Sequence, residues 1–159
     1  MKILIVSDTH RRNENLYEVV ERIGKIDVLI HCGDTECPSE LIEEIAGCHT
    51  IIVRGNNDFF SMLDKERVVN ISKYKVMIVH GHTYNVSLGV DMLVDEAMSR
   101  GANIVMYGHT HRPHLEVRDD IVILNPGSLS YPRQEGRIPT YAIMEIDDEG
   151  EAHFSICNV

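Results

Sequence analysis

The sequence repeatedly places a short apolar run directly before a group of polar residues and glycines. In its first half the runs, each with a polar residue that follows, are Ile3–Val6 with Asp8, Val28–Ile30 with Asp34, and Thr50–Val53 with Asn56. Short unbroken apolar runs are typical of strands buried on both faces. Such strands belong to parallel sheets covered by helices, so this pattern limits the architectures that the chain can adopt.

Amphipathic stretches separate these runs. Apolar residues recur at helical spacing over residues 13–23, and Pro38 opens a second helical stretch that ends at Gly47. The order strand, helix, strand, helix, strand predicts a parallel sheet with crossover helices. Because the carboxyl ends of parallel strands meet at one edge of a sheet, we expect Asp8, Asp34 and Asn56 to lie close together.

The second half predicts a mixed set of strands and one more helix, over Leu88–Ser99. The expected strands cover residues 67–71, 75–79, 104–106, 115–117, 121–124, 141–146 and 152–156. The stretch Asn125–Ser128 has the composition of a loop. No linker, charge block or repeat divides the sequence, so we expect a single domain over residues 1–159.

Side chains that can bind a metal follow five of the expected strands. They are Asp8, His10, Asp34, Asn56, His80, His109 and His111. Taken singly, each has an ordinary explanation: Asp34 as a turn residue, for example, or His80 as a half-buried histidine. Their joint placement at strand ends favours a metal site. The set is too large for one tetrahedral zinc and suits two metals that share a bridging carboxylate, about 3.5–4 Å apart.

The composition limits the partners. A formal net charge of −10 argues against stable binding to nucleic acid, although bound metal could still attract a small phosphate substrate. No apolar run is long enough to span a bilayer, and the start of the chain lacks the layout of a signal peptide. The four cysteines form no Cys-x-x-Cys pair, which favours a reducing cytoplasm.

The sequence resembles the calcineurin-like metallophosphoesterases through five motifs in order: Asp8-x-His10, Gly33-Asp34, Gly55-Asn56-x-Asp58, His80 and Gly108-His109-x-His111. Its short length and the stretch Asn125–Ser128 resemble more narrowly their small bacterial and archaeal phosphodiesterase branch. The resemblance implies an α/β fold, a four-layer αββα sandwich with two mixed β-sheets flanked by helices. It also implies an enzyme, a phosphodiesterase that acts through a dinuclear metal centre and a metal-bound hydroxide.

The resemblance further implies how the ligands divide between the metals. One metal would be held by Asp8, His10 and His111, the other by Asn56, His80 and His109, and Asp34 would bridge them. We expect two divalent ions, with manganese the first choice. Iron, nickel, zinc and magnesium fit the same ligand types.

Three further residues are candidates for catalysis: Asn57, Asp58 and His82. In the broader family the position of Asn57 usually holds a histidine that contacts the substrate phosphate; asparagine can donate a hydrogen bond but cannot transfer a proton. His82 could replace that function, and Arg133 could contact the phosphate. Asp58 is expected to orient a neighbouring group, with a helix cap ahead of Phe59 as an equally good alternative.

Two other functions remain open. One is a non-enzymatic scaffold for protein assembly, as the retromer subunit that resembles this branch provides; the other is a phosphomonoesterase. The completeness of the ligand set favours an enzyme whose partner is a small-molecule phosphodiester. The resemblance also favours a homo-oligomer, a dimer or larger.

Overall fold

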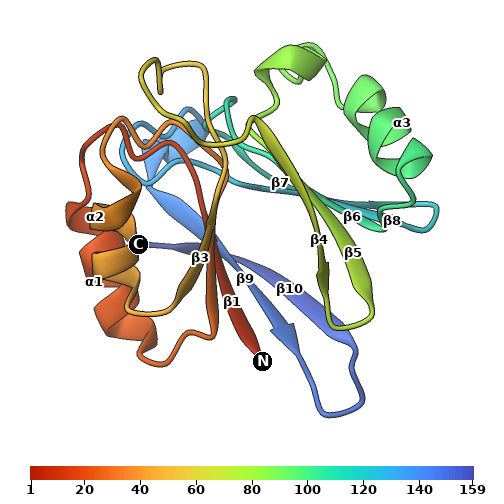
Figure 1. The fold of residues 1–159 in the computed structure, drawn as a ribbon, viewed down its shortest axis with the longest axis horizontal. Helices are drawn as coiled ribbons and strands as arrows, with labels where there is room; N and C mark the ends of the chain where they lie inside the picture. Colours follow the sequence, from red (N-terminus) through yellow and green to blue (C-terminus); the bar gives the residue numbers. More distant parts are fainter.

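The computed structural model describes residues 1–159 as two mixed five-stranded β-sheets packed face to face (Figure 1). The first sheet contains, in spatial order, β10 (Ala152–Asn158), β9 (Thr140–Ile146), β1 (Lys2–Val6), β2 (Val28–His31) and β3 (His49–Ile52). The second contains β4 (Glu66–Ile71), β5 (Tyr74–Val79), β6 (Ile104–Met106), β8 (Ile121–Pro126) and β7 (Pro113–Arg118). Three neighbouring strands of each sheet run parallel: β1, β2 and β3 in the first sheet, and β5, β6 and β8 in the second.

Helices cover both outer faces of this pair of sheets. The helices α1 (Glu14–Ile23) and α2 (Ser39–Ala46) pack on the first sheet, and α3 (Asp91–Ser99) packs on the second (Figure 1). Two short 3₁₀ helices cover His82–Tyr84 and Glu135–Arg137. The predicted four-layer αββα sandwich is therefore confirmed.

The alternation of side chains along a strand explains the layers. In β1, Ile3 and Ile5 belong to the apolar core between the two sheets, whereas Leu4 and Val6 pack against α1 and α2. Because successive side chains point to opposite faces, a strand that is apolar at every position can fill two layers of core at once. β5 does the same in the second sheet, with Met77 directed to the core beneath α3.

Several element boundaries differ from the sequence-based expectation by one to three residues, among them those of α3 and β8. α3 begins at Asp91 rather than Leu88, because Gly89 has a φ of +154°, which a right-handed helix cannot accommodate. Asn125 and Pro126, expected in a loop, form the end of β8. Pro126 lies opposite Pro113 at the end of the β7–β8 ladder, where a strand tolerates proline.

None of the helices combines the length and the apolar character that a bilayer crossing requires. The four cysteines are all free thiols. Cys32 is fully buried between the sheets, and burial raises the pKa of its thiol, so it packs as a small apolar residue.

Candidate metal centre

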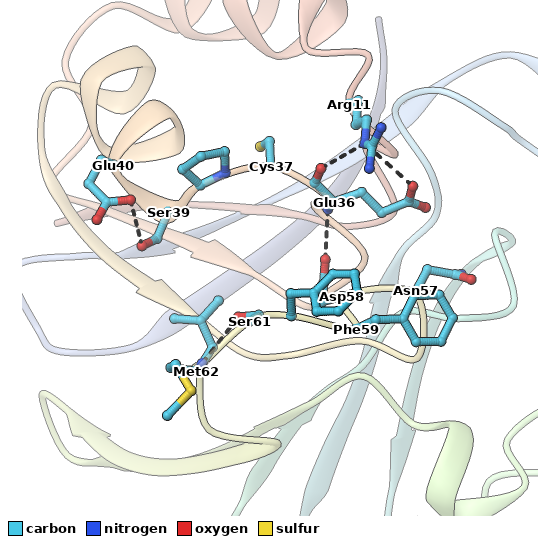
Figure 2. Close-up of a pocket in the computed structure, with 13 residues that line it drawn as sticks. Arg11, Glu36, Cys37, Ser39, Glu40, Asn57, Asp58, Phe59, Ser61 and Met62 are labelled. Carbon is cyan, nitrogen blue, oxygen red and sulfur yellow. Dashed lines mark hydrogen bonds and ion pairs between the residues drawn. The ribbon is translucent and has the colours of Figure 1, made fainter.

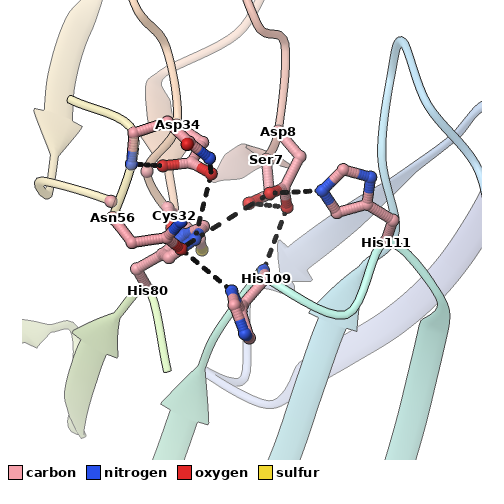
Figure 3. Close-up of polar contacts among 12 residues, drawn as sticks. Ser7, Asp8, Cys32, Asp34, Asn56, His80, His109 and His111 are labelled. Carbon is pink, nitrogen blue, oxygen red and sulfur yellow. Dashed lines mark hydrogen bonds and ion pairs between the residues drawn. The ribbon is translucent and has the colours of Figure 1, made fainter. Parts of the chain in front are cut away.

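The polar strand ends of both sheets meet at one end of the sandwich. Asp8, Asp34 and Asn56 follow β1, β2 and β3 of the first sheet, whereas His80 follows β5 and His109 follows β6 of the second (Figure 3). Parallel strands within each sheet present their carboxyl ends on the same side, so side chains far apart in the sequence converge. Tight backbone contacts hold the segments together: the N–H of Asp8 donates to the carbonyl of Gly33 at 3.0 Å, and that of His10 donates to the carbonyl of Asp34 at 3.0 Å.

Asp8, His10 and His111 form one half of the cluster. His111 Nε2 lies 3.1 Å from Asp8 Oδ1, and His10 Nε2 lies 3.8 Å from the same oxygen. The two histidine nitrogens are 3.3 Å apart. One nitrogen or oxygen from each residue therefore lies within 4.8 Å of the other two, a spacing at which one ion could contact all three.

Asn56, His80 and His109 form the other half. Asn56 Oδ1 lies 3.0 Å from both His80 Nε2 and His109 Nδ1. Asp34 Oδ2 lies between the halves, 3.4 Å from His80 Nε2 and 3.9 Å from His10 Nε2. Asp8 Oδ1 also reaches towards this half, 4.0 Å from His80 Nε2. All seven residues that the sequence marked as possible ligands are thus brought together.

Backbone carbonyls and a carboxylate fix the orientation of three histidines. Nδ1 of His80 lies 2.8 Å from the carbonyl of Cys32, and Nδ1 of His111 lies 2.8 Å from the carbonyl of Tyr131. Nδ1 of His10 lies 2.5 Å from Glu36 Oε1. A carbonyl can only accept, so Nδ1 of His80 and of His111 donates, and Nε2 is the ring nitrogen left for another partner. The Nε2 atoms of the three rings face the carboxylates of Asp8 and Asp34.

The buried carboxylate oxygens at the centre of the cluster require a positive charge close to them. Asp8 Oδ1 is buried and makes no hydrogen bond of good geometry, although His10 and His111 converge on it. An unpartnered buried anionic oxygen is costly unless a cation compensates it. Imidazole, carboxylate and amide side chains together suit divalent transition metals. The residues present therefore fit the divalent metal ions that the sequence analysis expects.

The charges of the cluster shift the two central carboxylates towards their ionised forms. Burial alone would raise the pKa of Asp34, but the hydrogen bond and charge of His80 and two N–H groups of Asn57 outweigh it and hold the pKa well below its usual value. Burial likewise opposes ionisation of Asp8, and His111, His80 and Ser7 together lower its pKa. Both groups are therefore anionic at neutral pH, the form that a metal ligand requires.

The backbone at the site is unusual. The non-glycine residues with a left-handed φ include five of the seven candidate ligands: Asp8 (55°), His10 (47°), Asp34 (57°), His109 (67°) and His111 (56°). Such residues are uncommon, each costs of order 1 kcal/mol or more, and they gather at functional sites. The sharp turns direct side chains from the strand ends back over the edge of the sheets.

Two glycines allow this close packing. A Cβ on Gly108 would lie 2.0 Å from Ser7 Oγ and 2.8 Å from Asp8 Oδ2. A Cβ on Gly55 would lie 2.0 Å from Asp34 Oδ1. These approaches leave no room for a side chain, so both positions require glycine for Asp8 and Asp34 to keep their places.

Asp58 lies behind the cluster and accepts four hydrogen bonds. Its carboxylate accepts from the backbone N–H groups of Asp34 (2.8 Å), Gly55 (2.8 Å) and Glu36 (2.7 Å), and from the Thr35 hydroxyl (3.2 Å). No helix follows it, so the alternative interpretation as a helix cap is wrong. Asp58 instead ties together the two loops that carry Asp34 and Asn56.

Asn57 and His82 take different positions relative to the cluster. Asn57 holds Asp34 twice: its Nδ2 donates to Asp34 Oδ2 at 2.6 Å and its backbone N–H to Oδ1 at 2.8 Å. The ring of His82 lies 5.5 Å from that of His80 and 6.1 Å from that of His109. Burial and the charge of His80 lower the pKa of His82, which keeps its ring neutral.

Several supporting groups gave no signal in the sequence. Glu36 orients His10, and the carbonyl of Tyr131 orients His111. The hydroxyls of Ser128 and Ser130 both donate to the carbonyl of Asp8, each at 2.8 Å. Any residue could supply the carbonyl at Tyr131, and Glu36 resembles any surface acid in the sequence. Ser128 does lie in a stretch with a recognisable pattern, but that pattern assigned it no role.

A cavity of about 670 Å³ opens beside Asn57 (Figure 2). Its wall combines apolar and acidic side chains: Phe59 and Phe60, which are 76% and 99% exposed, Met62, Glu36 and Glu40. The cavity therefore offers an apolar, acidic surface next to the candidate metal centre.

A buried histidine beneath the site makes stability depend on pH. Burial lowers the pKa of His31 from 6.5 to about 4, although Asp8 and Asp58 oppose the shift. Between these values the unfolded chain binds more protons than the folded one, so stability is present above pH 6.5 and is lost as the pH falls towards 4. We expect the unfolding free energy of the metal-free protein to fall by roughly 3 kcal/mol through His31 as the pH drops from 6.5 to 4.

Urea unfolding of His31→Gln at several pH values checks this prediction, because glutamine can still accept the Gly33 N–H that His31 Nδ1 accepts at 3.2 Å. The variant should be less sensitive to pH between 6.5 and 4. His49→Gln, at an exposed position in β3, is the matched control. Parallel stability curves for the wild type and His31→Gln would contradict the prediction.

Comparison with known proteins gives consistent matches over most of the chain. A family model described as the calcineurin-like phosphoesterase superfamily domain matches residues 1–149. A probable metallophosphoesterase of Bacillus subtilis, YsnB, is 30% identical over 152 residues, which cover 94% of this chain and 86% of the relative.

Solved structures show the same architecture. An archaeal phosphodiesterase superposes with a TM-score of 0.75 at 28% identity, covering 99% of this chain and 100% of that chain. A single mutant of Vps29 from Entamoeba histolytica superposes with a TM-score of 0.79, covering 100% and 99% of the two chains. Because the sequence identity is 21%, the match to Vps29 shows a shared fold and nothing further.

Proposed function

The chain belongs to the calcineurin-like phosphoesterase superfamily, and from this premise we propose that it is a phosphodiesterase that uses two divalent metal ions. The observation that carries the proposal is the convergence of three histidine Nε2 atoms on two buried carboxylates. A surface kept only for protein assembly would gain nothing from such an arrangement, whose backbone strain and buried charge cost stability.

The ligand sets proposed for the two ions follow the two halves of the cluster. Asp8, His10 and His111 would hold one ion; Asn56, His80 and His109 would hold the other. Asp34, whose Oδ2 lies 3.9 Å from His10 Nε2 and 3.4 Å from His80 Nε2, would bridge them. When bound, two such ions neutralise the charge of a phosphodiester and lower the pKa of a water towards neutrality.

The chain's own residues orient this site. Asn57 donates to Asp34 and so holds the carboxylate that would bridge the ions, and Asp58 fixes the loops that carry Asp34 and Asn56. His82 stands at the edge of the second half with a neutral ring, from which it could donate or accept a hydrogen bond. Because neither Asn57 nor a carboxylate ligand supplies a proton, we propose that the enzyme favours esters with good leaving groups.

The diester, rather than the monoester, is proposed because a structurally similar archaeal protein is a phosphodiesterase. Manganese is the first metal that we propose. Iron, nickel, zinc and magnesium fit the same nitrogen and oxygen ligands. The free thiols suit a reducing cytoplasm.

Activity assays on metal-stripped protein test the proposal. Adding manganese back should restore hydrolysis of bis(4-nitrophenyl) phosphate, and this hydrolysis should be faster than that of 4-nitrophenyl phosphate. Because the two esters share one leaving group, the comparison measures the preference for a diester over a monoester. The matched control is His153→Gln, since His153 is exposed and pairs with Asp147 away from the site.

Two outcomes would contradict it. A preference for the monoester would make the protein a phosphomonoesterase. No turnover of either ester with manganese, iron, nickel, zinc or magnesium, although the metal binds, would leave the scaffold as the better explanation.

A further inference from the structure

Three arginines close to the candidate metal centre lack an acidic partner. Five arginines elsewhere on the molecule form ion pairs: Arg11, Arg22, Arg67, Arg100 and Arg118. Of the other two, Arg12 lies over the ring of Tyr131 and Arg54 donates to the carbonyl of Ser61. Arg112, Arg133 and Arg137 form no ion pair with any carboxylate, although the chain carries a formal charge of −10. Unpaired guanidinium groups in so acidic a protein indicate a ligand that supplies the negative charge.

These arginines line one cavity together with two of the proposed metal ligands. The cavity has a volume of about 620 Å³, and its charged or titratable lining residues are Arg112, Arg133, Arg137, His10, His111 and Tyr131. No acidic residue lines it. The cavity beside Asn57, in contrast, is lined by Glu36, Glu40 and Asp58, and its one arginine, Arg11, is paired with Glu36 (Figure 2). An anionic group next to the site would therefore occupy the arginine side.

Hydrogen bonds fix the arginine segment to the metal ligands. The backbone N–H of Arg133 donates to the carbonyl of His111 at 2.9 Å, and His111 Nδ1 lies 2.8 Å from the carbonyl of Tyr131. The ring of Tyr131 lies 5.3 Å from that of His10 and carries the guanidinium of Arg12 at 4.7 Å from its centroid. The cavity wall and the metal centre therefore form one continuous surface.

We propose that the substrate is a small phosphodiester that carries a second phosphate group, and that Arg112, Arg133 and Arg137 bind this second group. The inference rests on the proposed function, because His10 and His111 would hold a metal at the reacting phosphate and also line the cavity. Guanidinium groups recognise phosphate through paired, charge-assisted hydrogen bonds. A polymeric polyanion does not fit, because the net charge of the whole chain would repel it beyond the cavity.

A pair of substrates that differ only in the second phosphate tests this proposal. They are the 4-nitrophenyl ester of thymidine 5′-phosphate and the same ester with an added 3′-phosphate. We expect the 3′-phosphorylated ester to have a kcat/KM about tenfold or more higher, and this preference to disappear in Arg133→Gln/Arg137→Gln. Glu135→Gln, in the same segment but outside the cavity lining, should keep the preference.

Binding to metal-free protein separates this proposal from the proposed function. Calorimetry should give thymidine 3′,5′-bisphosphate an affinity at least about tenfold higher for the wild type than for Arg133→Gln/Arg137→Gln. If neither ester is hydrolysed with any metal but this difference in affinity holds, only the phosphodiesterase proposal fails. If the esters are hydrolysed at equal kcat/KM, or if the bisphosphate binds both proteins equally, the arginine cavity is no phosphate site.

Discussion

Replacing Asp34 with asparagine is expected to lower metal-dependent diester hydrolysis by at least about a thousandfold. Asp34 Oδ2 lies between the two halves of the cluster, and asparagine removes the negative charge that two cations would share. One half of the site could still gather around Asp8, so partial metal binding can survive without activity. The informative measurements are kcat/KM for an aryl diester and the number of manganese ions bound per chain.

The unfolding free energy must be measured beside these values. The pKa of Asp34 is depressed in the folded protein, so its carboxylate contributes stability at neutral pH that asparagine removes. Asp95→Asn, at an exposed position of α3, changes the same functional group far from the site and should leave activity unchanged. If Asp34→Asn keeps manganese-dependent turnover within tenfold of the wild type, Asp34 does not bridge two metals.

Replacing Asp58 with alanine is expected to cost about 3–5 kcal/mol of unfolding free energy. The change leaves the N–H groups of Asp34, Gly55 and Glu36 without their acceptor at the base of the site. Each unsatisfied buried group costs about 1–3 kcal/mol. Urea denaturation of metal-free protein measures this loss directly.

Metal affinity tests whether Asp58 also positions the site. Groups that hold metal ligands in place typically contribute 10- to 100-fold in affinity, so Asp58→Ala should weaken manganese binding by about that factor. Asp58→Asn keeps one acceptor oxygen and should recover part of both losses. Asp64→Ala, which removes an exposed acid paired with Arg67, is the control. Unchanged manganese affinity in a destabilised Asp58→Ala would limit Asp58 to a structural role.

The residue pattern was sufficient to predict the buried parallel strands and the seven clustered side chains, whereas the four-layer sandwich came from the family resemblance. Apolar runs such as Ile3–Val6 can only be strands buried on both sides, and polar residues after parallel strands must share an edge. That these residues are metal ligands stays a prediction, and so does the single-domain assignment.

Other parts of the site could not be read from residue types. The carbonyls of Cys32 and Tyr131 orient two histidines, and any residue could supply a carbonyl at those positions. The cavity places Arg133 and Arg137 beside His10, more than a hundred residues away in the chain. Such proximity depends on how loops fold over the strand ends, which periodicity does not encode.

The division of the cluster between two sheets has a consequence for how the molecule holds together. Asp8, His10, Asp34 and Asn56 come from the first sheet, whereas His80, His109 and His111 come from the second. An ion bound by residues from both sheets would cross-link the sheets, and its full set of ligands would form only when the two sheets are packed together. By mass action, the concentration of that ion would then add to the free energy needed to separate the two sheets.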